Sequence, residues 1–344
     1  MVEDSGLSAA LAGDERAFGE LAERHRWELR VHCYRMLGSY DDADDIVQET
    51  FLKAWRRRET FAGRSTFRAW LYKIATNACL DLIDRDGRRA RPYQVPPLVG
   101  PEAEPPFEVA WLEPVPDHVL APDTAEDPAA AAVARETIEL AFLVAIQRLP
   151  ARQRAVLITR DVLGWPAGET AALLGTSVAS VKSALQRARA TLKDHLPPRR
   201  DDWSRAREPD AREQALLRRY VQAHQQADLD ALAGLLAEDV QVTMPPYPAW
   251  LVGRDPLLTL TAQVFDQASE WYHGGWRGVV TRANLQPAVA HYVQHPTAEE
   301  TRSLAGAYRA QVLDVLRVDD GRITAITSFA PRHFAAFGLS LVLS

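Results

Sequence analysis

Prolines divide this chain into separately folding parts. Ten of its 22 prolines lie between Pro92 and Pro128. Proline lacks a backbone N–H and has a fixed φ angle, so no regular helix or strand can persist through such a stretch. The sequence therefore predicts a linker from 92 to 130, in part polyproline-like and in part acidic.

Within the linker, Trp111 and Leu112 stand out in the stretch WLEPVPD. A flexible spacer does not need two large apolar side chains next to each other. Two interpretations remain open at this point. The stretch is either a peptide that docks on a folded domain, or a disordered segment with an incidental tryptophan.

Before the linker, the residues from Asp41 to Arg58 have the pattern of an amphipathic helix. The apolar side consists of Ala43, Val47, Phe51, Ala54 and Trp55. The polar side consists of Asp41, Asp44, Asp45, Gln48 and Glu49. Acids at the start and arginines at the end suit the helix dipole. An isolated acidic side like this one is more often a solvated surface than a binding surface.

Helices are also expected on both sides of this one. An apolar stripe over residues 8–38 predicts one or two helices, and Gly38 and Ser39 end them. Another helix, with Ser65 or Thr66 as its N-cap, should run to about Arg85. Its packing stripe is expected to be Phe67, Leu71, Ile74, Ala75, Ala78 and Leu82, with Arg68, Tyr72, Lys73, Thr76 and Asn77 facing solvent. Four helices that share apolar sides predict a compact first domain over residues 1–91.

After the linker, residues 131–197 are helical again and contain a helix-turn-helix pattern. Gly175, Thr176 and Ser177 form the tight turn, and Pro166 suits the first turn of the preceding helix. The packing residues are expected to be Ala171, Leu174, Val178, Val181 and Leu185. The outer side of the second helix carries Ser180, Lys182, Ser183, Gln186, Arg187 and Arg189. Such side chains reach base edges and phosphates in a major groove.

Residues 210–338 change in pattern, with helical stretches first and alternating, strand-like stretches after them. Asp319, Asp320 and Gly321 predict a hairpin turn between the last two strands. This order predicts an α+β cone. Its aromatic residues can line a ligand pocket or fill a core; they are Trp250, Phe265, Trp271, Tyr272, Trp276, Tyr292 and Tyr308. Its acids and histidines have no spacing that demands catalysis, which favours solvated acids and structural histidines; they are Asp228, Asp230, Asp239, Asp266, His273 and His291.

Three stretches together resemble a known family. They are AxDIVQETFLKAW, TFAGRSTFRAWLYKIATNACLD and ETAALLGTSVASVKSALQRARATL. In this order and spacing they are similar to extracytoplasmic-function (ECF) sigma factors of bacterial RNA polymerase, of the subgroup with an extra SnoaL-like or NTF2-like C-terminal domain. The resemblance implies a multidomain protein: sigma region 2 over 1–91, the linker, region 4 over 131–197, and a regulatory cone over 210–338. It also implies core RNA polymerase and promoter DNA as partners, with a small molecule or a protein as a possible signal at the cone.

The resemblance assigns roles to residues. The polar side of the first acidic helix (Asp41, Asp44, Asp45, Gln48 and Glu49) would bind the polymerase clamp. The upstream promoter element, where the duplex first opens, would contact Arg64, Ser65, Thr66, Phe67, Tyr72, Lys73 and Asn77. Region 4 would read duplex DNA through Ser177, Ser180, Lys182, Ser183, Gln186, Arg187 and Arg189. Trp111 and Leu112 would belong to a regulatory linker. No catalytic residue, metal or cofactor is expected, because no P-loop, dinucleotide fingerprint or nucleophile elbow is present.

The net charge of the whole chain hides a local concentration of basic residues. The formal net charge of -6 argues against a nucleic-acid binder. Between Lys53 and Arg91, however, eleven basic residues face four acidic ones, so a basic surface is concentrated there. The two cysteines match no metal spacing and are expected to be buried thiols. With no signal peptide or membrane-spanning stretch in view, a cytoplasmic protein is expected.

Two rival interpretations remain at the level of sequence. One is a one-component regulator that binds DNA through its helix-turn-helix and senses a ligand in the cone. The other is an enzyme with a DNA-binding appendage. Neither explains the pattern of the first domain.

Overall fold

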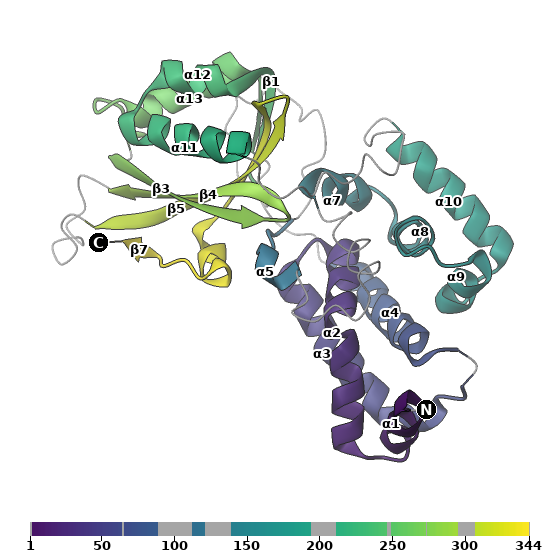
Figure 1. Ribbon diagram of the computed structural model, residues 1–344. Coiled ribbons are helices and arrows are strands. Elements are labelled where there is room, and N and C mark those ends of the chain that lie inside the picture. The colour runs from purple at the N-terminus through teal and green to yellow at the C-terminus, as the bar shows by residue number, and fades with distance from the viewer. Residues whose placement is uncertain are drawn as a thin grey trace. The chain divides into compact units, whose positions relative to one another are not determined.

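The computed structural model describes residues 2–63, 65–88, 112–120, 139–193, 211–245, 249–272, 274–294 and 307–343. It divides into two compact units (Figure 1). The helical unit takes residues 1–92 and 120–205 from both sides of the linker. The second unit, called the cone below, combines residues 206–344 with residues 93–119 of the linker itself.

The first half of the helical unit consists of α1 (Val2–Leu11), α2 (Glu15–Leu37), α3 (Tyr40–Arg56), the 3-10 turn η1 (Arg58–Thr60) and α4 (Phe67–Arg88). Capping residues set these bounds. Asp14 accepts a hydrogen bond from the Ala17 amide at the start of α2, and Gly38 ends that helix with a φ of 73°. Ser39 then caps α3, and Thr66 caps α4 with a 3.1 Å bond from the Ala69 amide. The acidic helix and its neighbours are thus confirmed close to their predicted limits.

The second half of the helical unit consists of α7 (Leu140–Gln147), α8 (Ala151–Leu157), the π-helical turn η2 (Ile158–Val162), α9 (Ala167–Leu174) and α10 (Val178–Leu192). Pro166 precedes α9 as its N-cap. Gly175 ends α9 in the left-handed conformation, and Ser177 caps α10. The helix-turn-helix is therefore present where the sequence predicts it.

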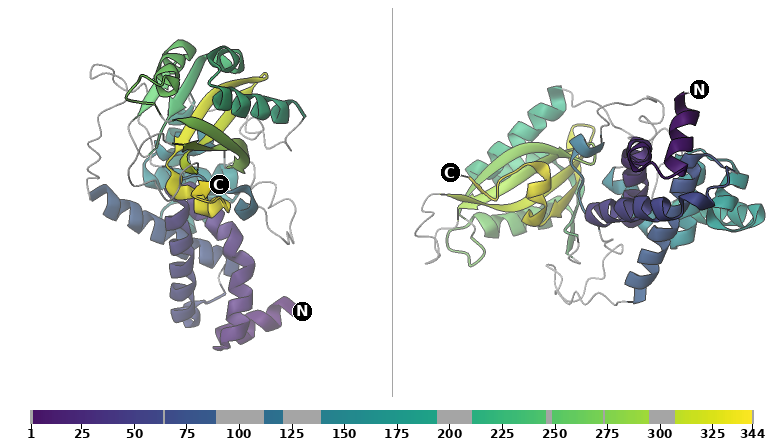
Figure 2. Two further views of the ribbon diagram at one scale, coloured as in Figure 1. Left: turned by 90° about the vertical axis from the view of Figure 1, so that its left-hand side faces the viewer. Right: turned by 90° about the horizontal axis from the view of Figure 1, so that it is seen from below.

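The cone has the predicted order of helices followed by sheet. Its helices are α11 (Ala211–Gln226), α12 (Leu229–Leu235) and α13 (Arg254–Phe265). Its strands are β1 (Leu236–Thr243), β2 (Trp250–Val252), β3 (Gly275–Ala283), β4 (Gln286–Gln294), β5 (Tyr308–Asp319), β6 (Arg322–Phe329) and the short β7 (Val342–Leu343). The 3-10 segment η5 (Pro331–Phe337) follows β6. Two views of the ribbon show the helices on one side of the sheet (Figures 1 and 2).

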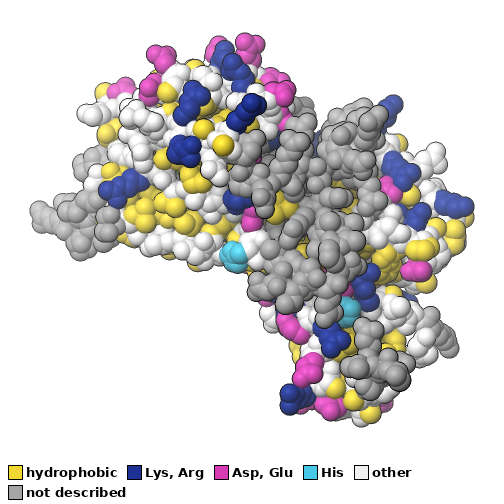
Figure 3. Space-filling model, viewed as in Figure 1, with side chains coloured by type: hydrophobic (Ala, Val, Ile, Leu, Met, Phe, Trp, Pro, Cys, Tyr) yellow, Lys and Arg dark blue, Asp and Glu magenta, His cyan; other side chains and the backbone are white. Residues whose placement is uncertain are grey.

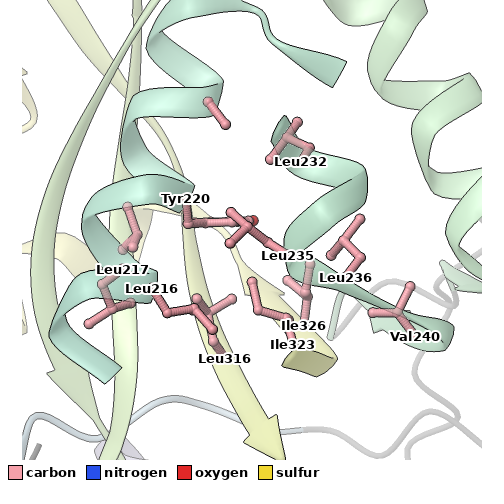
Figure 4. Close-up of a cluster of buried hydrophobic side chains, with 12 residues drawn as sticks. Leu216, Leu217, Tyr220, Leu232, Leu235, Leu236, Val240, Leu316, Ile323 and Ile326 are labelled. Atoms are coloured by element: carbon pink, nitrogen blue, oxygen red, sulfur yellow. The ribbon is translucent and has the colours of Figure 1, made fainter. Parts of the chain in front are cut away.

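The sheet is mixed, in the order β2-β1-β6-β5-β4-β3, and β1 pairs with β6 in parallel. Asp320 and Gly321 both have positive φ angles and join β5 to β6 as a two-residue hairpin, as predicted. The core lies between α11, α12 and the sheet (Figure 4). It is built mainly from leucine and isoleucine; its members include Leu216, Leu217, Leu232, Leu235, Leu316, Ile323 and Ile326.

Candidate polymerase and nucleic-acid interfaces

Helix α3 presents the predicted acidic side to solvent. Asp41, Asp45 and Gln48 are exposed. Asp44 forms a 2.8 Å ion pair with Arg30, and Glu49 forms one of 2.7 Å with Lys53. These pairs hold two of the five polar side chains in place without covering the surface.

The apolar side of α3 packs on α2 and α4. Ala43, Val47 and Ala54 are buried as predicted, whereas Phe51 and Trp55 are partly exposed. Ile46 and Thr50 complete the buried stripe, and the sequence interpretation missed both. The helix is thus fixed on one side, so its acidic side is presented on a rigid element.

The predicted contacts to the upstream promoter element fall into two groups. Ser65, Thr66, Lys73 and Asn77 are exposed and lie in the first half of α4 or just before it. Phe67 and Tyr72 are buried. Arg64 lies outside the described residues.

The burial of Tyr72 and Thr76 corrects the expected solvent side of α4. Tyr72 is 1% exposed, and Thr76 is buried with its hydroxyl 2.9 Å from His32 Nε2. The reason is that α4 packs on α2 and α3 and also on α8 and α9 from beyond the linker. A helix covered from two directions has a wider buried surface than one apolar stripe predicts.

Tyr72 lies at the centre of this contact. Its ring is 5.1 Å from the Trp165 ring, and its hydroxyl donates to Glu28 over 3.3 Å. Arg68 donates to the same carboxylate from Nε over 2.6 Å. Burial would raise the pKa of Glu28, but the hydrogen bond from His25 and the Arg68 charge outweigh it and lower the pKa below its ordinary value. Glu28 therefore stays ionised and holds Arg68 and Tyr72 in fixed positions.

A buried arginine joins the two halves of the helical unit. Arg154 on α8 is 6% exposed, and its guanidinium donates to the carbonyl of Met36 in the last turn of α2. Its other acceptors are the carbonyls of Ile146, Gln147 and Leu149. Burial lowers the pKa of Arg154 to about 10, so the side chain remains charged at neutral pH. The sequence interpretation missed this residue, because ARQRAVL reads as an ordinary amphipathic turn.

The helix-turn-helix exposes its predicted reading side. Ser177, Ser180, Lys182, Ser183, Gln186, Arg187 and Arg189 are all exposed, and Lys and Arg side chains lie over α10 (Figure 3). Arg189 is held by Asp161, with Nε to Oδ2 at 2.9 Å and Nη2 to Oδ1 at 2.6 Å. Val178 is 42% exposed, which corrects its predicted packing role. It is the first residue of α10, directly after the N-cap Ser177.

The linker segment Leu112–Val119 docks on the cone. Leu112 is 1% exposed. Val115 forms two hydrogen bonds with Asn284: the Val115 N–H donates to Asn284 Oδ1 over 3.0 Å, and the Val115 carbonyl accepts from the backbone N–H of Asn284 over 2.8 Å. Asp117 accepts from the Leu285 amide over 2.7 Å and from Arg282 Nε over 2.8 Å. Trp111 lies outside the described residues.

The β3–β4 turn shapes this docking site. Asn284 and Leu285 have φ angles of 56° and 61°. Asparagine tolerates this conformation, but for leucine it costs about 1 to 2 kcal/mol. The turn aims the Leu285 amide at Asp117, so the hydrogen bonds to the linker help to offset that cost.

The predicted acids of the cone are solvated, as expected. Asp228 caps α12, and Asp230, Asp239 and Asp266 are exposed. His291 is buried, and His273 lies outside the described residues. The sequence interpretation did not single out Asp314, a buried acid on β5 next to His291.

Comparisons with known proteins match these three parts. Residues 21–89 match Sigma-70 region 2, residues 139–192 match Sigma-70 region 4, and residues 217–326 match the SnoaL-like domain. The chain is 43% identical to the ECF RNA polymerase sigma factor SigG of Mycobacterium tuberculosis over 303 residues, which cover 86% of this chain and 78% of that relative. It is 34% identical to SigM of the same organism over 186 residues, which cover 54% and 80%.

A solved structure supports the fold over nearly the whole chain. The crystal structure of the Mycobacterium tuberculosis ECF sigma factor SigJ matches with a TM-score of 0.59 at 24% identity, over 94% of this chain and 99% of that one. Region 2, region 4 and their order define an RNA polymerase sigma factor of the sigma-70 class. Within that class, the chain belongs to the ECF sigma factors and carries a C-terminal SnoaL-like domain. It binds core RNA polymerase and directs promoter recognition and transcription initiation.

The part of the chain that the structure describes contains no helix long and apolar enough to cross a membrane.

Proposed function

We propose that this sigma factor binds core polymerase through the acidic side of α3, contacts promoter DNA through α4 and α10, and is held in a closed form by its own domains. The observation that carries the closed form is the packing of Trp165 on Tyr72. A tyrosine covered in this way is not accessible to an unstacked base, so promoter capture requires the two halves of the helical unit to separate.

Charge and exposure support the polymerase-binding surface. Asp41, Asp45 and Gln48 are exposed on one side of a rigid helix, beside the paired Asp44 and Glu49. An acidic surface of this kind suits a basic partner, whose charge would speed encounter and fix the register of binding.

The DNA-binding proposal has a separate basis in each half. In α4 the exposed Lys73 and Asn77 would contact the strand that opens, with Tyr72 joining them after separation. In α10 the exposed Lys182, Gln186 and Arg187 would reach the duplex. Arg189 would instead position α10, because Asp161 holds its guanidinium in a two-bond contact.

The docked linker supports a regulatory role for the cone. In the sequence, residues 112–119 lie midway between the two halves of the helical unit. In the structure, hydrogen bonds hold this segment on the cone. Fixing the middle of a linker divides it into two shorter tethers, which limits how far the two halves can separate. Release of the linker would lengthen the tether and favour the open form. The proposal assigns the protein to the cytoplasm, where it meets polymerase, and gives the cone no catalytic step.

Binding to purified core RNA polymerase tests the docking surface. Glu49→Arg in the full chain should weaken binding at least tenfold, because it reverses one charge of the surface and repels Lys53. Glu20→Arg makes the same charge change on the exposed side of α2 and should leave binding within twofold. Equal loss in both variants, or in neither, would reject α3 as the docking surface. Binding of promoter DNA by the chain without polymerase would favour a one-component regulator instead.

A further inference from the structure

Strand β5 leaves a gap on one of its two edges. Residues 309–315 of β5 pair with β4 on the first edge. The second edge is shared, because β6 pairs with Leu313–Asp319 and β7 pairs with Tyr308 and Arg309. Within the described ladders, Gln311 and Val312 pair with neither β6 nor β7. A notch therefore separates the end of β6 from β7.

A groove with a volume of about 370 Å³ opens at this notch and is called the β7 groove below. Its lining residues come from the start of β5, the start of η5 and the end of the chain; they are Arg309, Ala310, Pro331, Arg332, Leu341 and Val342. None of them belongs to α11, α12 or α13, and β7 and η5 lie on the side of the sheet away from those helices (Figure 1). The β7 groove is therefore outside the space between the helices and the sheet. Its volume is in the range of small-molecule sites, which is about 300 to 1,000 Å³.

The β7 groove offers apolar side chains but few free backbone groups. Leu341 is 55% exposed and Val342 is 37% exposed. Ser340 Oγ donates to the Val342 carbonyl over 2.7 Å and accepts from the Val342 N–H over 3.2 Å, and the Leu341 carbonyl accepts from the Ala310 amide over 2.9 Å. Because these backbone groups already have partners, an added strand would gain little here. The exposed apolar surface favours hydrocarbon instead.

Two arginines add positive charge to this apolar surface. Arg309 is exposed, and its guanidinium has no hydrogen bond or ion pair with any residue that the structure describes. Arg332 Nε donates to His333 Nε2 over 3.1 Å, and its Nη2 lies 4.0 Å from Glu113 Oε1, at the limit of an ion pair. The Arg332 side chain remains 47% exposed, so a ligand can still reach it.

This combination of charges determines the class of ligand. A planar guanidinium binds a carboxylate through two parallel hydrogen bonds. Glu113 offsets part of the charge of Arg332, so the β7 groove suits one negative charge better than the two of a phosphate group. The apolar surface beside the arginines requires that the rest of the ligand be hydrocarbon.

We propose that the β7 groove binds a small apolar monocarboxylate, with its hydrocarbon on Pro331, Leu341 and Val342 and its carboxylate at Arg309 and Arg332. The proposal requires only a folded cone. It does not depend on the closed form or on the docking surfaces proposed above, so their failure would leave it unchanged.

Three probes separate the contribution of charge from that of hydrocarbon. Octanoate carries both, 1-octanol has the same chain without the charge, and butyrate has the charge with a shorter chain. Calorimetric titration of the full chain in low-salt buffer should show octanoate binding at least fivefold more tightly than octanol, and at least tenfold more tightly than butyrate. Added salt should weaken the binding of octanoate more than that of octanol, because salt screens the exposed arginines.

Arg309→Gln tests the charge directly, because it removes the guanidinium and keeps a side chain of similar length. The variant should bind octanoate about fivefold more weakly and bind octanol as the wild type does. Arg317→Gln is the matched control on the same strand, since Arg317 is also exposed and pairs with Asp319 outside the groove. It should change neither affinity.

Methyl NMR signals show where octanoate binds in the wild-type chain. Octanoate should shift the signals of Leu341 and Val342 and leave that of Leu216, in the core under the helices, unchanged. Equal affinities for octanoate and octanol, equal effects of the two arginine variants, or shifts confined to the core would each overturn the proposal. So would tighter binding of a short acidic peptide that contains leucine, which would assign the groove to a protein partner. A dimer in light scattering that Leu341→Ser dissociates would likewise assign it to a second copy of the chain.

Discussion

At the scale of single residues, Arg154 shows how one side chain can hold two sigma regions together. Its guanidinium is buried, has no carboxylate partner in the part of the chain that the structure describes, and donates to backbone carbonyls of α2, of α7 and of the α7–α8 connection. A buried cation is tolerated when its donors are all used. The carbonyl of Met36 near the end of α2 is a favourable acceptor, because the helix dipole makes that end negative.

Arg154→Ala is expected to lower the free energy of unfolding of the helical unit by about 2 to 4 kcal/mol, since it leaves several buried carbonyls without a donor. Arg152→Ala, an exposed position on the same helix, should change it by no more than about 0.5 kcal/mol. Urea unfolding followed by circular dichroism measures both. Similar values for the two variants would contradict the role of Arg154.

Sequence patterns predict residues well where a single stripe decides burial. Ala43, Val47 and Ala54 on α3 are examples. Sequence patterns fail where a helix also contacts residues that lie far away in the sequence. Tyr72 is buried because its ring contacts Trp165 from the second half of the helical unit, which follows about 90 residues later in the sequence. Helical periodicity carries no information about such a contact.

At the scale of elements, turn chemistry fixes the helix-turn-helix. Gly175 has a φ of 60°, and a Cβ added there would meet nothing within 4 Å. The need for glycine is therefore conformational and not steric. The same local rules made Thr66 and the Asp320–Gly321 turn predictable from sequence, because caps and two-residue hairpins depend on neighbours in the chain.

Gly175→Ala should destabilise the helical unit by about 1 to 2 kcal/mol, because alanine is strained at positive φ. Gly168→Ala, in α9, should stabilise it by about 0.5 kcal/mol, because alanine has less freedom to lose on folding and a Cβ meets nothing there. Thermal unfolding of the full chain measures both shifts. The same sign of shift in the two variants would contradict this account of the turn.

At the scale of the whole molecule, composition and motif order predict the three folded parts, and the proline count predicts the linker. What sequence could not supply is where the linker binds. Val115 and Asn284 are 169 residues apart in the sequence. The β3–β4 turn, which contains Asn284, depends on an unusual φ angle at Leu285. From Trp111 and Leu112 the sequence left open whether this stretch docks, and it could not indicate that the β3–β4 turn is the place where the linker binds.

Asp117→Ala tests whether the docked linker controls the protein. The change removes the acceptor of the Leu285 amide and the ion pair with Arg282, so the segment around Val115 should exchange its amide hydrogens at least tenfold faster. If the docked linker favours the closed form, transcription from a cognate promoter should rise at equal protein concentration, while binding of the open form to core polymerase through α3 stays intact. His118→Ala, at the next and exposed position, should leave exchange and transcription unchanged. Faster exchange without any change in transcription would show that the linker docks on the cone but does not regulate initiation.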